Sequence, residues 1–152
     1  MIQRIDTDKK RYLDLLLEAD PDEAMIDRYL EAGEMYVLFE KGQPLAEAVL
    51  LDRGRGVCEL MNLAVRPGFQ GQGWGGLLIR HLFHEARSRF HTMLVGTADA
   101  SDRALRVYQR EGFTIDHRIP GFFTENYPHP IIEENGMPCV DMIVLKKKLR
   151  EG

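Results

Sequence analysis

Hydrophobic and polar positions along the chain follow the two periods of regular secondary structure. Apolar residues recur at helical spacing over 12–19, 25–30 and 74–90, and a further amphipathic run covers 101–111. Shorter apolar runs bounded by turn residues predict strands at 2–5, 35–40, 45–51, 57–65, 92–97, 113–119 and 139–145. The order β-α-α-β-β-β-α-β-α-β-β therefore predicts an α+β fold, an α/β/α sandwich with a mixed central sheet and helices on both faces.

The second predicted helix carries a start signal. Asp20 is expected to cap it, Pro21 suits its first turn, and Glu23 completes a capping box. Gly33 is expected to end this segment.

Composition and charge narrow the class of protein. The 152 residues are 44% hydrophobic, which fits a single domain over 1–152 with a real core. A net charge of −4 leaves no excess of basic residues to bind phosphates, so nucleic acid is not expected as a partner. The mild acidity is compatible with a cationic amine substrate. Charges follow the first residues and no apolar run reaches membrane-spanning length, so we expect a cytoplasmic protein without a signal peptide or membrane partner. Two buried free thiols, Cys58 and Cys139, are favoured over one bridge between strands.

The most informative stretch runs from Val65 to Gly76, between an apolar strand and a long amphipathic helix. Its glycines permit close backbone approach, and a helix starting near Trp74 presents unpaired N–H groups and the positive end of its dipole. Such an arrangement is an anion cradle, most often for phosphate. No Lys-Ser or Lys-Thr follows, so this is not a Walker loop. Gly71, Gly73 and Gly76 meet the dinucleotide spacing G-x-G-x-x-G, but their lead-in differs from that motif.

Two blocks resemble the GNAT (N-acetyltransferase) superfamily. The family's pyrophosphate loop is Gln/Arg-x-x-Gly-x-Gly/Ala after a strand that ends Val-x-Pro. The corresponding residues are Val65, Pro67, Gln70, Gly73 and Gly75. The segment 104–113, Ala-Leu-Arg-Val-Tyr-Gln-Arg-Glu-Gly-Phe, is similar to the family's Ala-x-x-x-Tyr-x-x-x-Gly-Phe. Both blocks stand in the family's order, and the resemblance, which runs from Ile2 to Leu149, implies a GNAT-like, mostly antiparallel sheet.

The resemblance implies acetyl-CoA as acetyl donor. The backbone of Leu63 and Val65 would pair with the pantetheine like an added strand, while the loop wraps the pyrophosphate. Ser101 stands where the family often has an asparagine that contacts the cofactor. The implied cofactor-binding residues are Leu63, Val65, Gln70, Gly71, Gln72, Gly73, Trp74, Gly75, Gly76, Ser101 and Ala104.

Acetyl transfer to an amine also needs an acid and a base. Tyr108 occupies the family's general-acid position; the alternative is a core aromatic. Glu59 stands six residues before Val65, where the histone-acetylating branch of the family carries its general-base glutamate. Strand alternation places Glu59 on one face with Met61, Leu63 and Val65. The alternative is a glutamate at a solvated strand end. Asn62, on the opposite face by the same alternation, is a weaker candidate that would orient a water or bind substrate.

The other polar residues do not form a recognisable catalytic or metal-binding motif. His81 and His84 stand at i, i+3 spacing on a helix, and exposed helix residues are favoured there over a metal site. No metal is therefore expected.

The segment 120–137 is longer than an ordinary hairpin connection, which has about two to five residues. Its aromatic residues argue against disorder. We expect it to help form the acceptor site, with Phe123 and Tyr127 walling an apolar pocket and Glu125, Glu133 or Glu134 attracting a cation. A homodimer contact is the alternative.

These features predict an acetyl-CoA-dependent N-acetyltransferase, acting on a primary amine of a small molecule or peptide by direct attack in a ternary complex. One alternative is a non-catalytic acyl-CoA-binding regulatory module, against which an intact Tyr108 argues. The other is a protein lysine or N-terminal acetyltransferase, which should show a peptide-sized groove.

Overall fold

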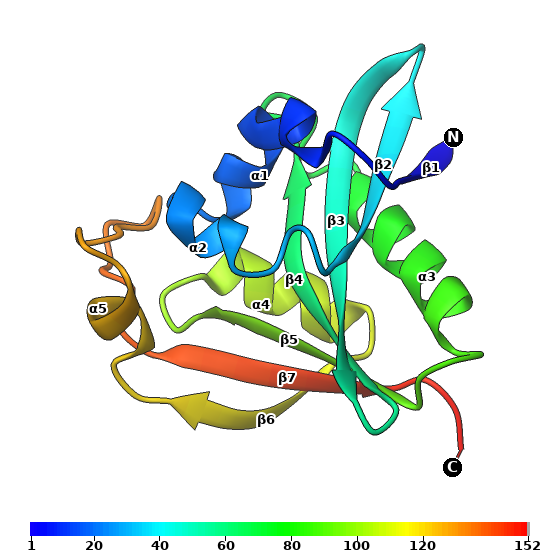
Figure 1. Cartoon of the computed structure of the whole chain (residues 1–152). Helices are drawn as coiled ribbons and strands as arrows, with labels where there is room; N and C mark the ends of the chain where they lie inside the picture. The colour runs from blue at the N-terminus through cyan, green and yellow to red at the C-terminus, as the bar shows by residue number, and fades with distance from the viewer. Residues whose placement is uncertain (152) are drawn as a thin grey trace.

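The computed structural model describes residues 1–151, which form a seven-stranded sheet with helices on both faces (Figure 1). The strands run in the order β1-β2-β3-β4-β5-β7-β6. Their bounds are Ile2–Ile5 (β1), Glu34–Glu40 (β2), Gln43–Gly54 (β3), Val57–Val65 (β4), Thr92–Ala98 (β5), Thr114–Ile119 (β6) and Met142–Lys148 (β7). The helices are Leu13–Ala19 (α1), Glu23–Asp27 (α2), Trp74–Ala86 (α3), Asp102–Arg110 (α4) and Phe122–Asn126 (α5), with a 3₁₀ turn at Lys9–Tyr12 (η1).

Adjacent strands are antiparallel except for β4 and β5, which are parallel. A parallel pair needs a crossover connection, and α3 supplies it. The predicted mixed α+β class with a mostly antiparallel sheet is confirmed.

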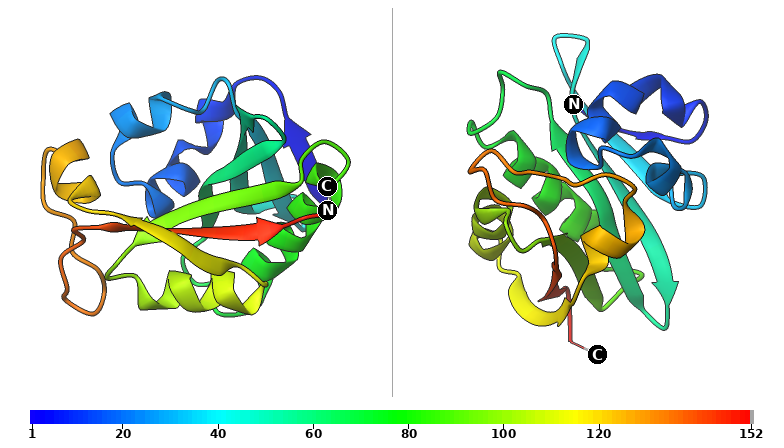
Figure 2. Two further views of the ribbon diagram at one scale, coloured as in Figure 1. Left: turned by 90° about the horizontal axis from the view of Figure 1, so that it is seen from below. Right: turned by 90° about the vertical axis from the view of Figure 1, so that its left-hand side faces the viewer.

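Two hydrophobic clusters lie on opposite faces of the sheet. The larger one packs Leu78, Ile79 and Leu82 of α3 against the sheet, at the helical spacing that the sequence displays. The second packs Leu16 of α1 and Ile26 of α2 against the other face. The left view of Figure 2 shows α1 and α2 on one side of the sheet and α3 and α4 on the other.

The cap of the second helix differs from the prediction. Asp22 is the N-cap, and its carboxylate accepts hydrogen bonds from the backbone N–H groups of Ala24 (2.9 Å) and Met25 (3.3 Å). Asp20 is instead buried and bonds to two tyrosines. Aspartates flank Pro21 on both sides, so the local pattern alone did not identify the cap.

The final strand lies three residues further along the chain than 139–145. Cys139 is held in the preceding segment, where its N–H donates to the carbonyl of Ile131 (2.8 Å). Lys146, Lys147 and Lys148 extend β7 because their backbone groups pair with β5, whatever the polarity of their side chains. The connection before β7 contains α5, a helix that the sequence did not predict.

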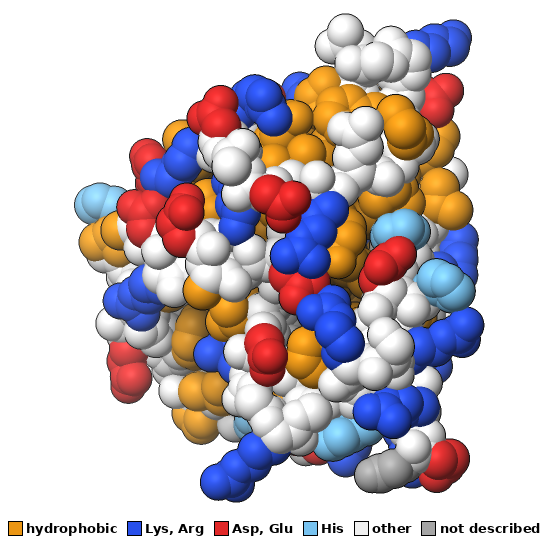
Figure 3. Space-filling model, turned by 45° about the vertical axis from the view of Figure 1, so that its right-hand side comes forward, with side chains coloured by type: hydrophobic (Ala, Val, Ile, Leu, Met, Phe, Trp, Pro, Cys, Tyr) orange, Lys and Arg blue, Asp and Glu red, His pale blue; other side chains and the backbone are white. Residues whose placement is uncertain are grey.

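Both cysteines are free and buried, as expected. No helix in residues 1–151 is long and apolar enough to cross a membrane. On the face that Figure 3 displays, acidic and basic side chains are interspersed, which is typical of a solvated surface.

Candidate active site

The cleft of the molecule begins where β4 and β5 separate. Their parallel pairing runs from Val57 and Thr92 to Leu60 and Val95 and then stops, although both strands continue (Figure 1). The residues of β4 beyond Leu60 are paired with β3 on one edge only. Backbone groups on the other edge therefore remain available to an extended ligand.

A β-bulge at Met61 lies at this separation. Val49 of β3 pairs with Asn62 and Leu50 pairs with Leu60, which leaves Met61 without an opposite residue. The extra residue reverses the alternation of side chains along β4. Leu63 and Val65 consequently pack toward α3 and α4, whereas Met61 packs toward α1 and α2.

A cleft of about 1130 Å³ opens at this point. One wall is the diverging end of β4 together with the glycine loop and the start of α3, and α4 forms another. Residues of α1, α2 and the segment after β6 line the opposite end. We call that opposite end, around Asp20, Tyr29 and Tyr127, the acceptor end.

The glycine loop has the backbone conformation of an anion cradle. Gly71 and Gly73 have φ values of 76° and 92°, where a side chain would impose strain. A Cβ at either position would meet no atom within 4 Å, so the loop faces open space. Gly73 is the N-cap of α3, and the first N–H groups of that helix have no partner within it.

Gln70 ties the loop to the neighbouring elements. Its Nε2 donates to the carbonyl of Val65 (3.0 Å), and its Oε1 accepts from Arg103 of α4 (3.2 Å). Arg103 is thereby placed at the cleft beside the loop. The basic residues that line this part of the cleft are Arg80, Arg103, Arg106 and Arg110. Sequence reasoning missed this group, although three of its four members, Arg103, Arg106 and Arg110, stand on one predicted helix.

Of the predicted loop residues, Gln72 lies outside the cleft, and Gly76 leaves space for a neighbouring ion pair. Gln72 does not line the cleft; its Oε1 accepts from the indole N–H of Trp74 (3.4 Å). A Cβ at Gly76 would lie 2.8 Å from a carboxylate oxygen of Glu111, so this glycine makes room for the Arg80–Glu111 ion pair. Trp74, Gly75 and Gly76 line the cleft, and their binding of the cofactor stays a prediction.

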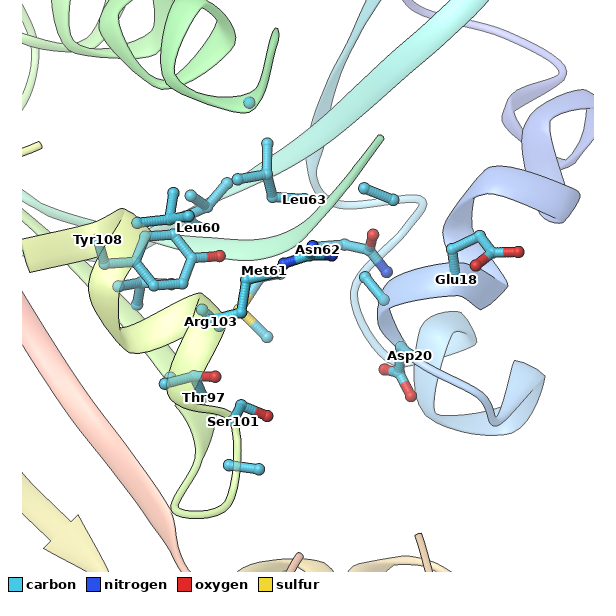
Figure 4. Close-up of a pocket in the computed structure, with 18 of the residues that line it drawn as sticks. Glu18, Asp20, Leu60, Met61, Asn62, Leu63, Thr97, Ser101, Arg103 and Tyr108 are labelled. Carbon is cyan, nitrogen blue, oxygen red and sulfur yellow. The ribbon is translucent and has the colours of Figure 1, made fainter. Parts of the chain in front are cut away.

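Tyr108 is buried on α4, and its ring meets Phe113 edge-on at 5.6 Å between centroids. Figure 4 shows its hydroxyl pointing toward β4, inside the cleft. No hydrogen bond from residues 1–151 engages that hydroxyl. Burial raises the pKa of Tyr108, so the phenol is neutral and able to donate a proton. Both sequence interpretations, core aromatic and cleft acid, fit this position.

Glu59 is not on the face that strand alternation predicted. Because of the bulge, it shares the α1–α2 face with Asn62 and lies opposite to Leu63 and Val65. It lines the cleft, and its Oε1 accepts from Nε of Arg53 at 2.9 Å. The carboxylate that the sequence suggested as base is thus held in an ion pair.

The acceptor end contains a hydrogen-bonded chain that sequence reasoning did not foresee. Asn62 donates through Nδ2 to the carbonyl of Leu16 (3.1 Å) and to the hydroxyl of Tyr29 (3.0 Å). Tyr29 donates to Asp20 Oδ2 (3.1 Å), and Tyr127 donates to Asp20 Oδ1 (2.8 Å). Asn62 therefore positions Tyr29 through its amide nitrogen, and its Oδ1 is buried without a partner among residues 1–151.

The segment after β6 contributes to the same end. Phe123 and Tyr127 line the cleft and their rings stack at 5.6 Å between centroids, with α5 on the same side of the sheet as α1 and α2 in Figure 2. The hydroxyl of Ser101 donates to Glu133, which joins the start of α4 to this segment. Ala104 lines the cleft one turn further on.

The residues around the cleft fit a coenzyme A thioester. A free strand edge suits the amides of a pantetheine chain, and the glycine loop with Arg103 suits phosphates. The Tyr108 hydroxyl suits a departing sulfur, since it is a neutral donor without a protein partner. No group of three or more metal-ligating side chains occurs in residues 1–151.

These features define the class of protein, and comparison with known proteins agrees. A model of the acetyltransferase (GNAT) family matches residues 2–113, and the chain belongs to this family of acetyltransferases.

Three relatives are similar over nearly their whole length. A Bacillus subtilis (strain 168) protein described as the uncharacterized N-acetyltransferase YvbK is 35% identical over 133 residues, covering 87% of this chain and 85% of that protein. A GNAT family acetyltransferase from Elizabethkingia anophelis, crystallised with acetyl-CoA bound, is 36% identical with a TM-score of 0.93 and 97% coverage of each chain. An IAA acetyltransferase from Bacillus cereus ATCC 14579 is 36% identical with a TM-score of 0.92, covering 97% of this chain and 98% of that one.

The family resemblance read from the two sequence blocks is confirmed, as is the enzyme class. The expected cofactor, acetyl-CoA, is the ligand of the Elizabethkingia relative.

Proposed function

We propose that this protein is an acetyl-CoA-dependent N-acetyltransferase that acetylates the primary amine of a small molecule by direct attack in a ternary complex. The observation that carries the proposal is the Tyr108 hydroxyl, a buried donor without a protein partner that faces the free edge of β4. Family membership supplies the reaction class.

The residues of the cleft have distinct roles in this reaction. Bound acetyl-CoA supplies an activated acetyl group as a thioester. The backbone groups of Leu63 and the N–H of Val65 orient it as an added strand, while the Val65 carbonyl accepts from Gln70. Gly71, Gly73 and Arg103 hold its phosphates. Tyr108 donates its phenolic proton to the sulfur as the carbon–sulfur bond breaks, which avoids release of a free thiolate.

A small acceptor is favoured over a peptide. The hydrogen bond from Tyr127 to Asp20 joins residues 107 positions apart and connects the segment after β6 to the α1–α2 turn across the acceptor end. A peptide needs a groove that is open at both ends, whereas this contact ties the two sides of the acceptor end together.

The test is release of free thiol from acetyl-CoA in the presence of a panel of primary amines and a lysine-containing peptide. We expect amine-dependent release with a small amine, and a rate lower by roughly 100-fold or more for Tyr108→Phe with unchanged acetyl-CoA affinity. Binding of acetyl-CoA without turnover of any acceptor would instead identify an acyl-CoA-binding module. Faster turnover of the peptide than of every small amine would reject the small-molecule assignment.

A further inference from the structure

The acceptor end holds a buried carboxylate that lacks a cation. Asp20 is 8% exposed and lines the cleft, and Figure 4 shows its side chain on the wall facing α4. Its side-chain hydrogen-bond donors are the neutral hydroxyls of Tyr29 and Tyr127, and the backbone N–H of Asp22 also stabilises its charge. It forms no ion pair with a Lys, Arg or His of residues 1–151. A carboxylate in this setting is completed by a ligand that brings positive charge and N–H donors.

We propose that Asp20 receives the ammonium group of the acceptor and takes its proton before acetyl transfer. This inference rests on the proposed function and names its substrate class. The acceptor is a primary amine on an apolar or aromatic body, without a carboxylate next to the amine.

The hydrogen-bonded chain fixes the direction of the Asp20 carboxylate. The carbonyl of Leu16 only accepts, so the Asn62 atom facing it must be Nδ2. The same Nδ2 donates to the oxygen of Tyr29, and the one hydroxyl proton of Tyr29 is therefore left for Asp20. Tyr127 fixes the second carboxylate oxygen. Each oxygen retains a lone pair for the acceptor, because a carboxylate offers about four acceptor sites.

The surrounding charges favour a cation and disfavour a second anion. Arg53 is neutralised by Glu59, which leaves Arg28 as the remaining base at this end. The ionisable groups that face or flank Asp20 are Glu18 from α1, Asp22, Arg28 and Tyr29 from α2 and its turn, Arg53 and Glu59 from β3 and β4, and Tyr127, Glu133 and Glu134 from the segment after β6. An acceptor with a carboxylate beside its amine would place that anion against Asp20.

The other side chains that line the acceptor end favour an apolar group on the acceptor molecule. Met25, Met61 and Phe123 line the same region, and Tyr127 stacks on Phe123. These flat and flexible apolar side chains suit an alkyl or aryl group.

The proton balance of the reaction is complete with these residues. One proton passes from the ammonium to Asp20, giving a neutral amine and a carboxylic acid that later releases the proton to water. The amine nitrogen bonds to the acetyl carbon, the carbon–sulfur bond breaks, and Tyr108 protonates the sulfur. The second proton lost by nitrogen restores Tyr108, so the products are the amide, free thiol and one proton in solution.

The experiment compares 2-phenylethylamine with phenylalanine, which has the same body and adds a carboxylate. The parent should acetylate the amine and discriminate against the amino acid by at least tenfold in kcat/KM. Asp20→Asn should raise the KM for 2-phenylethylamine by at least tenfold and remove the acid limb of the kcat/KM profile, with acetyl-CoA affinity unchanged. Glu31→Gln, which removes an exposed carboxylate outside the cleft, is the control and should change neither.

Tyr127→Phe provides a second variant in case Asp20→Asn fails to fold. Loss of one donor to Asp20 raises the pKa of that carboxyl, so the acid limb should move to higher pH, which a purely structural role of Tyr127 would not produce. An unmoved limb, or Asp20→Asn kinetics equal to those of the parent, overturns the inference while leaving the proposed function intact.

Calorimetry distinguishes a failure of this inference from a failure of the proposed function. If the parent acetylates no amine, titration of 2-phenylethylamine into the CoA-bound protein still tests the cation site. Binding that is lost in Asp20→Asn supports it, and absent or equal binding in both proteins rejects it.

Discussion

Replacement of Glu47 by glutamine is predicted to stabilise the protein at neutral pH. Glu47 lies in β3 and is fully buried, and neither carboxylate oxygen has a hydrogen-bond partner in residues 1–151. Burial raises its pKa well above the ordinary value; the backbone N–H of Ala64 opposes the shift without reaching hydrogen-bond geometry. The folded protein therefore holds this side chain as a neutral carboxylic acid.

The magnitude follows from proton linkage. In the unfolded chain the carboxyl ionises near the ordinary glutamate pKa of 4.5, whereas the folded protein retains the proton to a much higher pH. The stabilisation is complete below the unfolded pKa and is lost as pH rises toward the folded pKa. For one proton the loss is up to about 1.4 kcal/mol per pH unit, hence up to about 2.7 kcal/mol between pH values of about 5.5 and 7.5. Glu47→Gln does not lose this free energy of unfolding, because a glutamine side chain does not ionise.

The assay is urea unfolding of the parent and Glu47→Gln at several pH values. Glu40→Gln, an exposed position on β2, is the control and should follow the parent. We expect the stability of Glu47→Gln relative to the parent to grow with pH. A difference that is constant with pH, or a variant that is less stable at every pH, would refute the assignment of a neutral buried acid.

Three further predictions concern the loop, α4 and α2. Gly73→Glu should abolish acetyl-CoA binding in calorimetry, whereas Gly73→Ala should retain it at a stability cost of about 1–2 kcal/mol for the left-handed backbone; equal binding by all three proteins would contradict the phosphate role of the loop. Arg103→Gln should weaken acetyl-CoA about 2- to 5-fold, because its side chain is exposed, and the effect should shrink with added salt; a salt-independent effect would exclude a charge contact. Asp22→Ala should lower the free energy of unfolding by about 1 kcal/mol and Asp22→Asn should restore most of it; a thermal scan with no change in either variant would reject Asp22 as the cap.

The elements and the cofactor end of the cleft were predictable because their signals are local. A glycine in the sequence directly indicates a position where the backbone is unusual or approaches another group closely. Gly71 and Gly73 have positive φ values, and Gly71, Gly73 and Gly75 all line the cleft. The helical stripe of α3 likewise appears as buried residues in the core. In each case neighbours in sequence are also neighbours in space.

The side chains of β4 were harder to place. Strict alternation puts Glu59 on one face with Leu63 and Val65, but the bulge at Met61 inserts one residue and reverses the pattern. A bulge leaves no mark in the polarity of this strand, so the sequence did not reveal the reversal.

The acceptor end was not predictable at the level of contacts. Asp20 and Tyr127 meet although 107 positions separate them, and Asn62 joins Tyr29 across 33 positions. Asp20 also had a plausible local role as a helix cap, which concealed its long-range one. Phe123 and Tyr127 line the cleft, and their part in binding the acceptor stays a prediction.

The acetyl-transfer reaction is tested most directly by mass spectrometry of the products after incubation with 2-phenylethylamine and acetyl-CoA labelled in its acetyl group. We expect the label on the nitrogen of the amine, in a molar amount that exceeds that of the enzyme, and product formation by Tyr108→Phe that is slower by roughly 100-fold or more. Labelled acetyl-CoA that binds but stays intact with this and every other amine, or a Tyr108→Phe rate equal to that of the parent, would contradict it.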